Sequence, residues 1–112
     1  MEQNPVIEIK TSTGLRMIST RDIVYVKAAG KFSIVLMKDT DTYIAYNMLK
    51  WFCNSLPVSC FFRNHNSFLI SFSFVESYSS RSIKLTNNIE VPLSKTRFKA
   101  FKKNLKRFLE SQ

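Results

Sequence analysis

Apolar and polar residues alternate in short runs along most of the chain, and turn-forming residues separate the runs. Alternation with a period of two is typical of strands that bury one face. Twice the spacing changes to three and four residues, which is typical of helices. The pattern predicts a mainly β fold with one short middle helix and one C-terminal helix. The predicted strands are 6–10, 15–18, 23–26, 32–37, 42–46, 74–78, 83–86 and 89–91, with further extended runs at 61–62 and 68–72.

Both helices have recognisable beginnings. The first is predicted over 47–55, with Asn47 as a candidate N-cap and Pro57 beyond its end. The second is predicted from Lys95 onward, with Ser94 as its candidate cap. The residues of this helix expected to face the core share one stripe: Phe98, Phe101, Leu105, Phe108 and Leu109.

The stretch Phe61–Phe72 places a polar island, Arg63-Asn64-His65-Asn66-Ser67, between two apolar runs. We expect the apolar runs to be buried and the island to emerge between them as a tight loop. Arg, His, Asn and Ser hydrogen-bond base edges and phosphates, so the loop is a candidate site for reading nucleic acid. A polar turn in which the histidine forms its hydrogen bonds within the protein explains the same residues, and both interpretations stay open at this point.

Two other segments carry similar chemistry. After the turn at Gly30, Lys31 and Ser33 offer a phosphate or base contact, although an ordinary turn with a solvated lysine fits equally well. At the start of the last helix, Lys95, Thr96 and Arg97 crowd a terminus whose N–H groups favour an anion. Cations there oppose the helix dipole by up to about 1 kcal/mol, which hints at a ligand; a packing helix with a solvated basic face is the alternative.

The length of 112 residues predicts one domain spanning 1–112, with a core over about 6–109. Ten Phe, four Tyr and one Trp make such a core credible. Because no stretch resembles a signal peptide or a membrane span, we expect a cytoplasmic protein without membrane contact. Cys53 and Cys60 are expected to be reduced, partly buried thiols.

The charge is uneven along the chain. Seventeen Lys and Arg against eight Asp and Glu give a net charge of +9. Residues 81–112 hold nine of those basic residues and two of the acidic ones, for a net charge of +7. A concentrated basic region favours an anionic partner, with nucleic acid first and acidic lipid or protein behind it.

The chain lacks the residues of a recognisable enzyme. His65 is the only histidine, the acidic residues are scattered, and no phosphate loop, HExxH or paired CxxC motif occurs. We therefore expect a binding protein with no catalytic residues, no cofactor and no metal.

Taken together, these segments resemble the LytTR family of bacterial DNA-binding domains over roughly 6–109. The most specific likeness is the run Phe62 to Ile70 with the Phe61 that precedes it, which resembles the pattern F-x-R-x-H-x-S-[FY]-[LI]-V, with Ile70 in place of the final Val. The other matching pieces occur in the family's order: the strand 23–28 after Asp22, the turn 30–32, the helix 47–55, and the closing run 89–95 before the final helix. Two positions depart from the pattern: Ser71 replaces a usual Asn, and Lys95 replaces a common Arg.

The resemblance implies an elongated fold of small β-sheets that inserts loops into successive major grooves of direct-repeat promoter sites. It also implies a response-regulator output domain of a two-component system. Promoter DNA would be the partner, with a homodimer on paired repeats and a receiver or sensor domain that is separate or missing here, since no receiver domain lies in this chain. The expected DNA-binding residues are Lys31, Ser33, Arg63, His65, Asn66, Ser67, Lys95, Thr96 and Arg97.

Among these residues, Asn66 is expected to meet a base edge, because a carboxamide can pair with adenine at two atoms. His65 and Arg63 are expected to contact phosphate or support the loop, and Lys95 and Arg97 to contact phosphate or guanine. The alternative function is a basic module that binds protein or an anionic surface without reading a DNA sequence.

Overall fold

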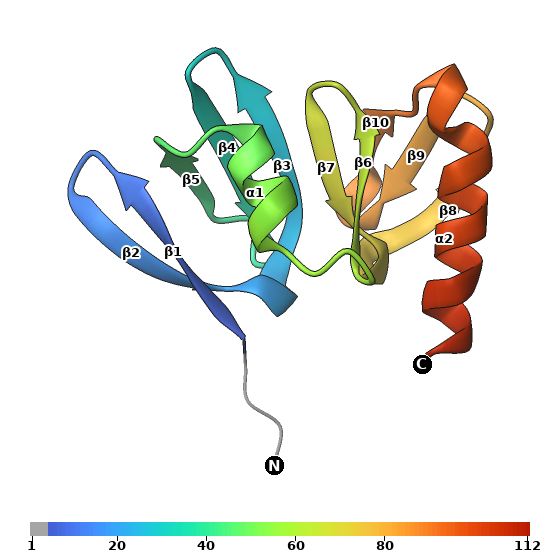
Figure 1. Cartoon of the computed structure of the whole chain (residues 1–112), viewed down its shortest axis with the longest axis horizontal. Helices are drawn as coiled ribbons and strands as arrows, with labels where there is room; N and C mark the ends of the chain where they lie inside the picture. The colour runs from blue at the N-terminus through green and yellow to red at the C-terminus, as the bar shows by residue number, and fades with distance from the viewer. Residues whose placement is uncertain (1–4) are drawn as a thin grey trace.

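The computed structural model describes residues 5–112 and arranges their strands in three sheets (Figure 1). The first is a hairpin of β1 (Val6–Thr11) and β2 (Gly14–Ser19). The central sheet has the order β5-β4-β3-β7-β6, from β3 (Ile23–Ala29), β4 (Phe32–Met37), β5 (Thr42–Ala45), β6 (Phe61–His65) and β7 (Phe68–Ser71). The third has the order β10-β9-β8, from β8 (Val75–Tyr78), β9 (Ser82–Leu85) and β10 (Ile89–Pro92).

Every strand pair in these sheets is antiparallel. Two α-helices complete the fold, α1 (Leu49–Ser55) between β5 and β6, and α2 (Phe98–Glu110) at the C-terminal end. The predicted mainly β fold with two helices is therefore confirmed. Short 3₁₀ turns occupy Thr20–Asp22, Phe72–Phe74, Thr86–Asn88 and Lys95–Arg97.

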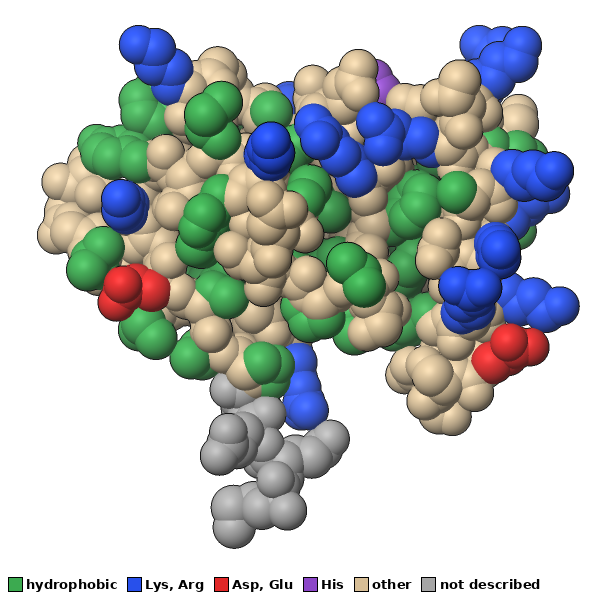
Figure 2. Space-filling view, in the orientation of Figure 1, with side chains coloured by type: hydrophobic (Ala, Val, Ile, Leu, Met, Phe, Trp, Pro, Cys, Tyr) green, Lys and Arg blue, Asp and Glu red, His purple; other side chains and the backbone are tan. Residues whose placement is uncertain are grey.

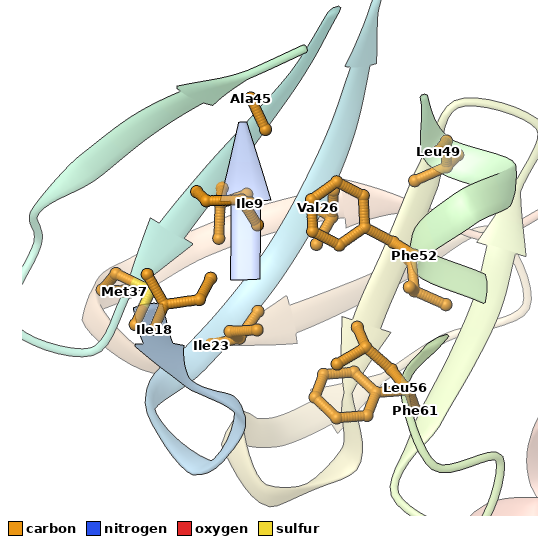
Figure 3. Close-up of a cluster of buried hydrophobic side chains, with 12 residues drawn as sticks. Ile9, Ile18, Ile23, Val26, Met37, Ala45, Leu49, Phe52, Leu56 and Phe61 are labelled. Carbon is orange, nitrogen blue, oxygen red and sulfur yellow. The ribbon is translucent and has the colours of Figure 1, made fainter. Parts of the chain in front are cut away.

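The central sheet separates two hydrophobic cores, because its side chains alternate between its faces. On β6, for example, Phe61 belongs to the first core and Phe62 packs against the second. The first core lies between the sheet, the β1–β2 hairpin and α1, where Phe52 and Val26 are fully buried (Figure 3). Alternation along the chain thus supplies apolar side chains to both sides of one sheet.

The second core is aromatic and holds α2 against the central and third sheets. Phe101 of α2 is fully buried, with its ring centroid 5.6 Å from that of Phe62 and 5.9 Å from that of Phe72. Such tilted and edge-on pairs add to the free energy gained from burying the rings themselves. This packing fixes the position at which α2 begins.

The structure corrects the expected cap of the middle helix. Met48, not Asn47, precedes the first turn, and no side chain caps it. The Asn47 side-chain oxygen instead accepts a hydrogen bond from the backbone N–H of Lys10, at 2.9 Å. The backbone N–H of Tyr46 donates to the carbonyl of Lys10 at 2.8 Å, so this segment ties β1 to the edge of the central sheet.

The C-terminal helix also differs from its prediction. Ser94 makes no side-chain cap, and its carbonyl accepts from the N–H of Arg97 in a 3₁₀ turn, so α2 begins three residues later than expected. Leu109 was expected in the buried stripe but is 60% exposed. It lies at the border of that stripe, in the last turn of α2, which extends past the third sheet (Figure 1).

The remaining strand predictions hold with small shifts. The run 74–78 begins one residue later, because Phe72–Phe74 forms a 3₁₀ turn. The terminal hairpin is present, and Asn87 and Asn88 adopt left-handed φ values of 62° and 61° in its connection. Cys53 and Cys60 are both free and half-buried, as expected. No helix within residues 5–112 is long and apolar enough to cross a membrane.

Candidate nucleic-acid interface

Three connections meet at one edge of the molecule, the upper edge in Figure 1. They are the β3–β4 turn at 30–31, the β6–β7 turn at 66–67 and the segment 94–97 between β10 and α2, together with the strand ends beside them. We call this surface the loop edge. The first two turns are neighbours because β3 and β7 pair antiparallel, with Lys27 opposite Phe68. Gly30 completes the first turn with a φ of +64°, a backbone conformation that glycine adopts without steric cost.

The β6–β7 turn is fixed by backbone and side-chain hydrogen bonds. Its Ser67 carbonyl accepts from the N–H of Ala28 at 2.8 Å, which joins the turn to β3. The N–H of Ser67 donates to Nδ1 of His65 at 3.1 Å. Because Nδ1 accepts, the proton of a neutral imidazole resides on Nε2, which is then a donor.

Asn64 connects the same turn to the third connection. Its side chain is fully buried, and Nδ2 donates to the carbonyl of Pro92 at 2.6 Å. The Asn64 carbonyl accepts from the N–H of Ser94 at 2.9 Å. These two hydrogen bonds set the position of 94–97 relative to β6.

Two arginines complete the connection. Arg97 donates to the side-chain oxygen of Asn66 at 3.1 Å and to the carbonyl of Arg63 at 3.3 Å. Arg63 in turn donates to the carbonyl of Asn66 at 2.8 Å. Asn66 is therefore held at its backbone by one guanidinium and at its side chain by the other.

The loop edge keeps its positive charge. The partners just described for Arg63 and Arg97 are neutral carbonyl and carboxamide oxygens, which do not neutralise either guanidinium charge. Cys53 lies close enough to respond to them: burial raises the pKa of its thiol, and the charges of Arg63 and Arg97 oppose that rise. Exposed Lys31 and Lys95 add to the same surface, which suits a polyanion.

Comparison with known proteins agrees with this picture. The family model for the LytTr DNA-binding domain matches residues 13–106. The chain belongs to the LytTR family. It is therefore a DNA-binding domain of the class that regulates transcription in two-component systems, and this family is defined by DNA binding and not by catalysis.

A solved structure supports the same fold for this LytTR domain. The LytTr DNA-binding domain of a putative methyl-accepting/DNA response regulator from Bacillus cereus superposes with a TM-score of 0.75 at 24% sequence identity. The match covers 89% of this chain and 95% of that one. A comparison with curated proteins gives no match.

The structure brings together most of the residues that the sequence singled out in this LytTR domain. Lys31, Asn66, Lys95 and Thr96 are exposed at the loop edge. Arg63, His65, Ser67 and Arg97 are half-buried there. The hydrogen bonds of Arg63 and His65 within the turn fit the support expected of these two side chains.

Ser33 is the exception. Its side chain is fully buried, and its hydroxyl donates to the carbonyl of Asn47 at 2.8 Å. It lies inside β4, where alternation directs it into the first core. Ser33 is thus a structural residue that ties β4 to the segment before α1, and we remove it from the proposed DNA-contacting set.

The polar island is also less loop-like than predicted. Arg63, Asn64 and His65 belong to strand β6, and only Asn66 and Ser67 form the turn. Sequence reasoning missed the role of Asn64, because a polar residue between Arg and His gives no sign of being buried. The observation that could have suggested it is alternation: Asn64 lies two residues after Phe62 in an extended run.

Proposed function

We propose that this LytTR domain reads a specific double-stranded DNA sequence through the loop edge, as part of a bacterial transcriptional regulator. The observation that supports the proposal most strongly is the Arg97–Asn66–Arg63 arrangement, which holds an exposed carboxamide and two guanidiniums in fixed positions. Fixed donors lose little conformational entropy on binding, so they favour one arrangement of base-edge atoms over others.

The dimensions of the molecule suit two successive grooves. Its principal extents are 39 × 39 × 25 Å, so the molecule is equally long in two directions and thinner in the third. The whole molecule therefore spans about one DNA helical turn, roughly 34 Å, along the horizontal direction of Figure 1, with the loop edge on one side of it. We propose that the connections at the two ends of the loop edge face neighbouring major grooves, each about 12 Å wide.

We assign a separate role to each side chain. Asn66 contacts a base edge, and because Arg97 occupies one lone pair of its oxygen, its amide N–H groups and the second lone pair remain for the base. Arg97 contributes donors beside it for guanine or phosphate, and Arg63 supports the turn. Phosphate contacts are assigned to the residues that surround this pair: Lys31, His65, Ser67, Lys95 and Thr96.

The wider biological setting is part of the same proposal. We infer that two copies bind paired direct repeats in promoters and that a receiver or sensor domain, linked or separate, controls them. Promoter binding would place the protein in the cytoplasm.

The test is selection from a random duplex-DNA library at near-physiological salt, with the wild-type domain and Asn66→Ala in parallel. The proposal predicts that wild type enriches a paired direct-repeat motif and that Asn66→Ala loses preference at defined positions within it. Tight, salt-sensitive binding without any enriched sequence would contradict it, because charge alone gives that result.

A further inference from the structure

A hollow of about 630 Å³ runs along α2, and none of the residues proposed to read DNA lines it. It is lined by Tyr78, Lys102, Lys103, Leu105, Lys106 and Leu109. Tyr78 ends strand β8, and the other residues lie in the middle and last turns of α2, which leads away from the loop edge (Figure 1). The hollow is thus a separate surface of the molecule.

The floor of the hollow is apolar. The Tyr78 ring packs edge-on against Phe101, with centroids 5.2 Å apart, and yet Tyr78 remains 43% exposed. Beside it, Leu105 is half-buried and Leu109 is exposed, one helical turn apart. Neighbouring exposed apolar side chains that line one concavity are typical of a binding surface, whereas isolated ones are not.

The rim of the hollow is uniformly basic. Lys102, Lys103 and Lys106 are exposed, and no acidic residue is among the lining side chains. Lys102 and Lys106 form an i, i+4 row parallel to the row of Leu105 and Leu109. Figure 2 shows Lys and Arg side chains gathered over the α2 side of the molecule, with an acidic side chain at the lower end of the group. In both rows the side chains are four residues, or about one helical turn, apart. A partner helix that carries an apolar row beside an acidic row has the same spacing.

We propose that this hollow docks an acidic amphipathic helix of a protein partner. Two apolar side chains one turn apart on the partner would cover Tyr78, Leu105 and Leu109, and flanking Asp or Glu would face the lysines. Such helix-in-groove docking is a recurrent mode of recognition. DNA has no apolar side chains to fill the floor, and a lipid surface is met by protruding apolar side chains rather than by a concavity.

The probe is a fluorescent synthetic peptide of about 15 residues, made of Leu, Ala and Glu with the leucines on one helical face, a length that can form a helix on docking. Its matched control has the same composition in scrambled order. At near-physiological salt, we expect the wild-type domain to bind the amphipathic peptide about tenfold more tightly than the scrambled one. Equal binding of the two peptides would overturn the proposal, because it would reduce the interaction to net charge.

Two variants locate the binding. Leu109→Asp and Lys106→Glu should each weaken peptide binding about tenfold, and both change exposed side chains, so circular dichroism should show an intact fold. The matched controls are Leu15→Asp and Lys10→Glu, another exposed leucine and lysine, paired across β1 and β2 in the hairpin. The controls should bind the peptide as wild type does.

Other outcomes would overturn the proposal in favour of a different ligand. If the α2 variants keep peptide affinity but lose binding to a duplex of random sequence, the hollow serves DNA. If they keep peptide affinity but lose binding to vesicles of anionic phospholipid, it serves a membrane surface. Loss of peptide binding with unchanged DNA binding supports the proposal, and it is independent of whether the loop edge reads a specific sequence.

Discussion

The molecule carries two basic surfaces whose charges are held in different ways. At the loop edge, Arg63 donates a hydrogen bond to the Asn66 carbonyl, and Arg97 donates to the Asn66 side-chain oxygen and to the Arg63 carbonyl. On α2, the charged side chains Lys99, Lys103, Lys106 and Arg107 are exposed on one helix. Fixed guanidiniums support directional recognition, whereas flexible lysines act as point charges on long stems. Positive charge alone therefore says little about where a DNA sequence is read.

We expect the largest effect from a substitution that removes the packing on which both surfaces depend. Phe101→Ala should lower the free energy of unfolding by about 3–5 kcal/mol, because it empties the centre of the second core. Denaturant unfolding followed by circular dichroism measures this loss. The control is Leu109→Ala, whose exposed side chain should change stability by less than about 0.5 kcal/mol. Similar losses in the two variants would contradict the described position of α2.

Arg97→Ala tests the fixed arginine of the loop edge. It should weaken specific DNA binding by about 1–3 kcal/mol, since it removes both the donor that we propose for DNA and the partner of Asn66. Arg97→Lys should restore only part of this loss, because an ammonium cannot reproduce the planar two-nitrogen arrangement. Titration with the selected duplex measures both effects, and full rescue by lysine would reduce Arg97 to a point charge.

Asn64→Ala separates positioning from contact with DNA. The Pro92 carbonyl would lose its buried donor, so we expect about 1–3 kcal/mol of lost stability. Below the unfolding temperature, the variant should lose preference for the selected sequence while its affinity for random duplex stays near that of wild type. Equal losses on both duplexes would show that Asn64 supports the fold without positioning the segment 94–97.

The smallest effects concern single lysines. Lys31→Gln should weaken binding to all sequences alike and reduce the slope of log affinity against log salt by about 1, as expected for one lost phosphate contact. The double change Lys102→Gln and Lys103→Gln should leave that slope nearly unchanged, because these residues line the hollow on α2. A slope reduced by about 2 in the double variant would place α2 along the DNA backbone.

Alternation and helical spacing were sufficient to predict most of the fold. Strands such as 32–37 and the buried face of α2 were predictable because apolar side chains at these spacings must be buried together in a core. The antiparallel hairpins were predictable because short connections join neighbouring strands. The burial of Leu109 was predicted wrongly, because helical spacing identifies which residues share a stripe but not how far the sheet that faces the helix extends along it. Its exposure depends on where β8 and β9 end.

The site was predicted in outline only. The motif around Arg63, His65 and Asn66 located the turn. The residues after Gly30 and the run Lys95 to Arg97 located the other two connections, and the family resemblance pointed to the same three places. Ser33, Asn47 and Asn64 could not be assigned correctly, because each forms a hydrogen bond with a residue distant in sequence. Such partners depend on sheet order and register, which a local pattern does not contain.

The central claim is that Asn66 and Arg97 act as one reading unit. A double-mutant cycle tests it, with affinities for the selected duplex measured for wild type, Asn66→Ala, Arg97→Ala and the double variant. The account predicts a coupling free energy of about 0.5–3 kcal/mol, because either substitution already disrupts the arrangement on which the other side chain depends. Effects that add to within about 0.3–0.5 kcal/mol would contradict it and would make the two side chains independent contacts.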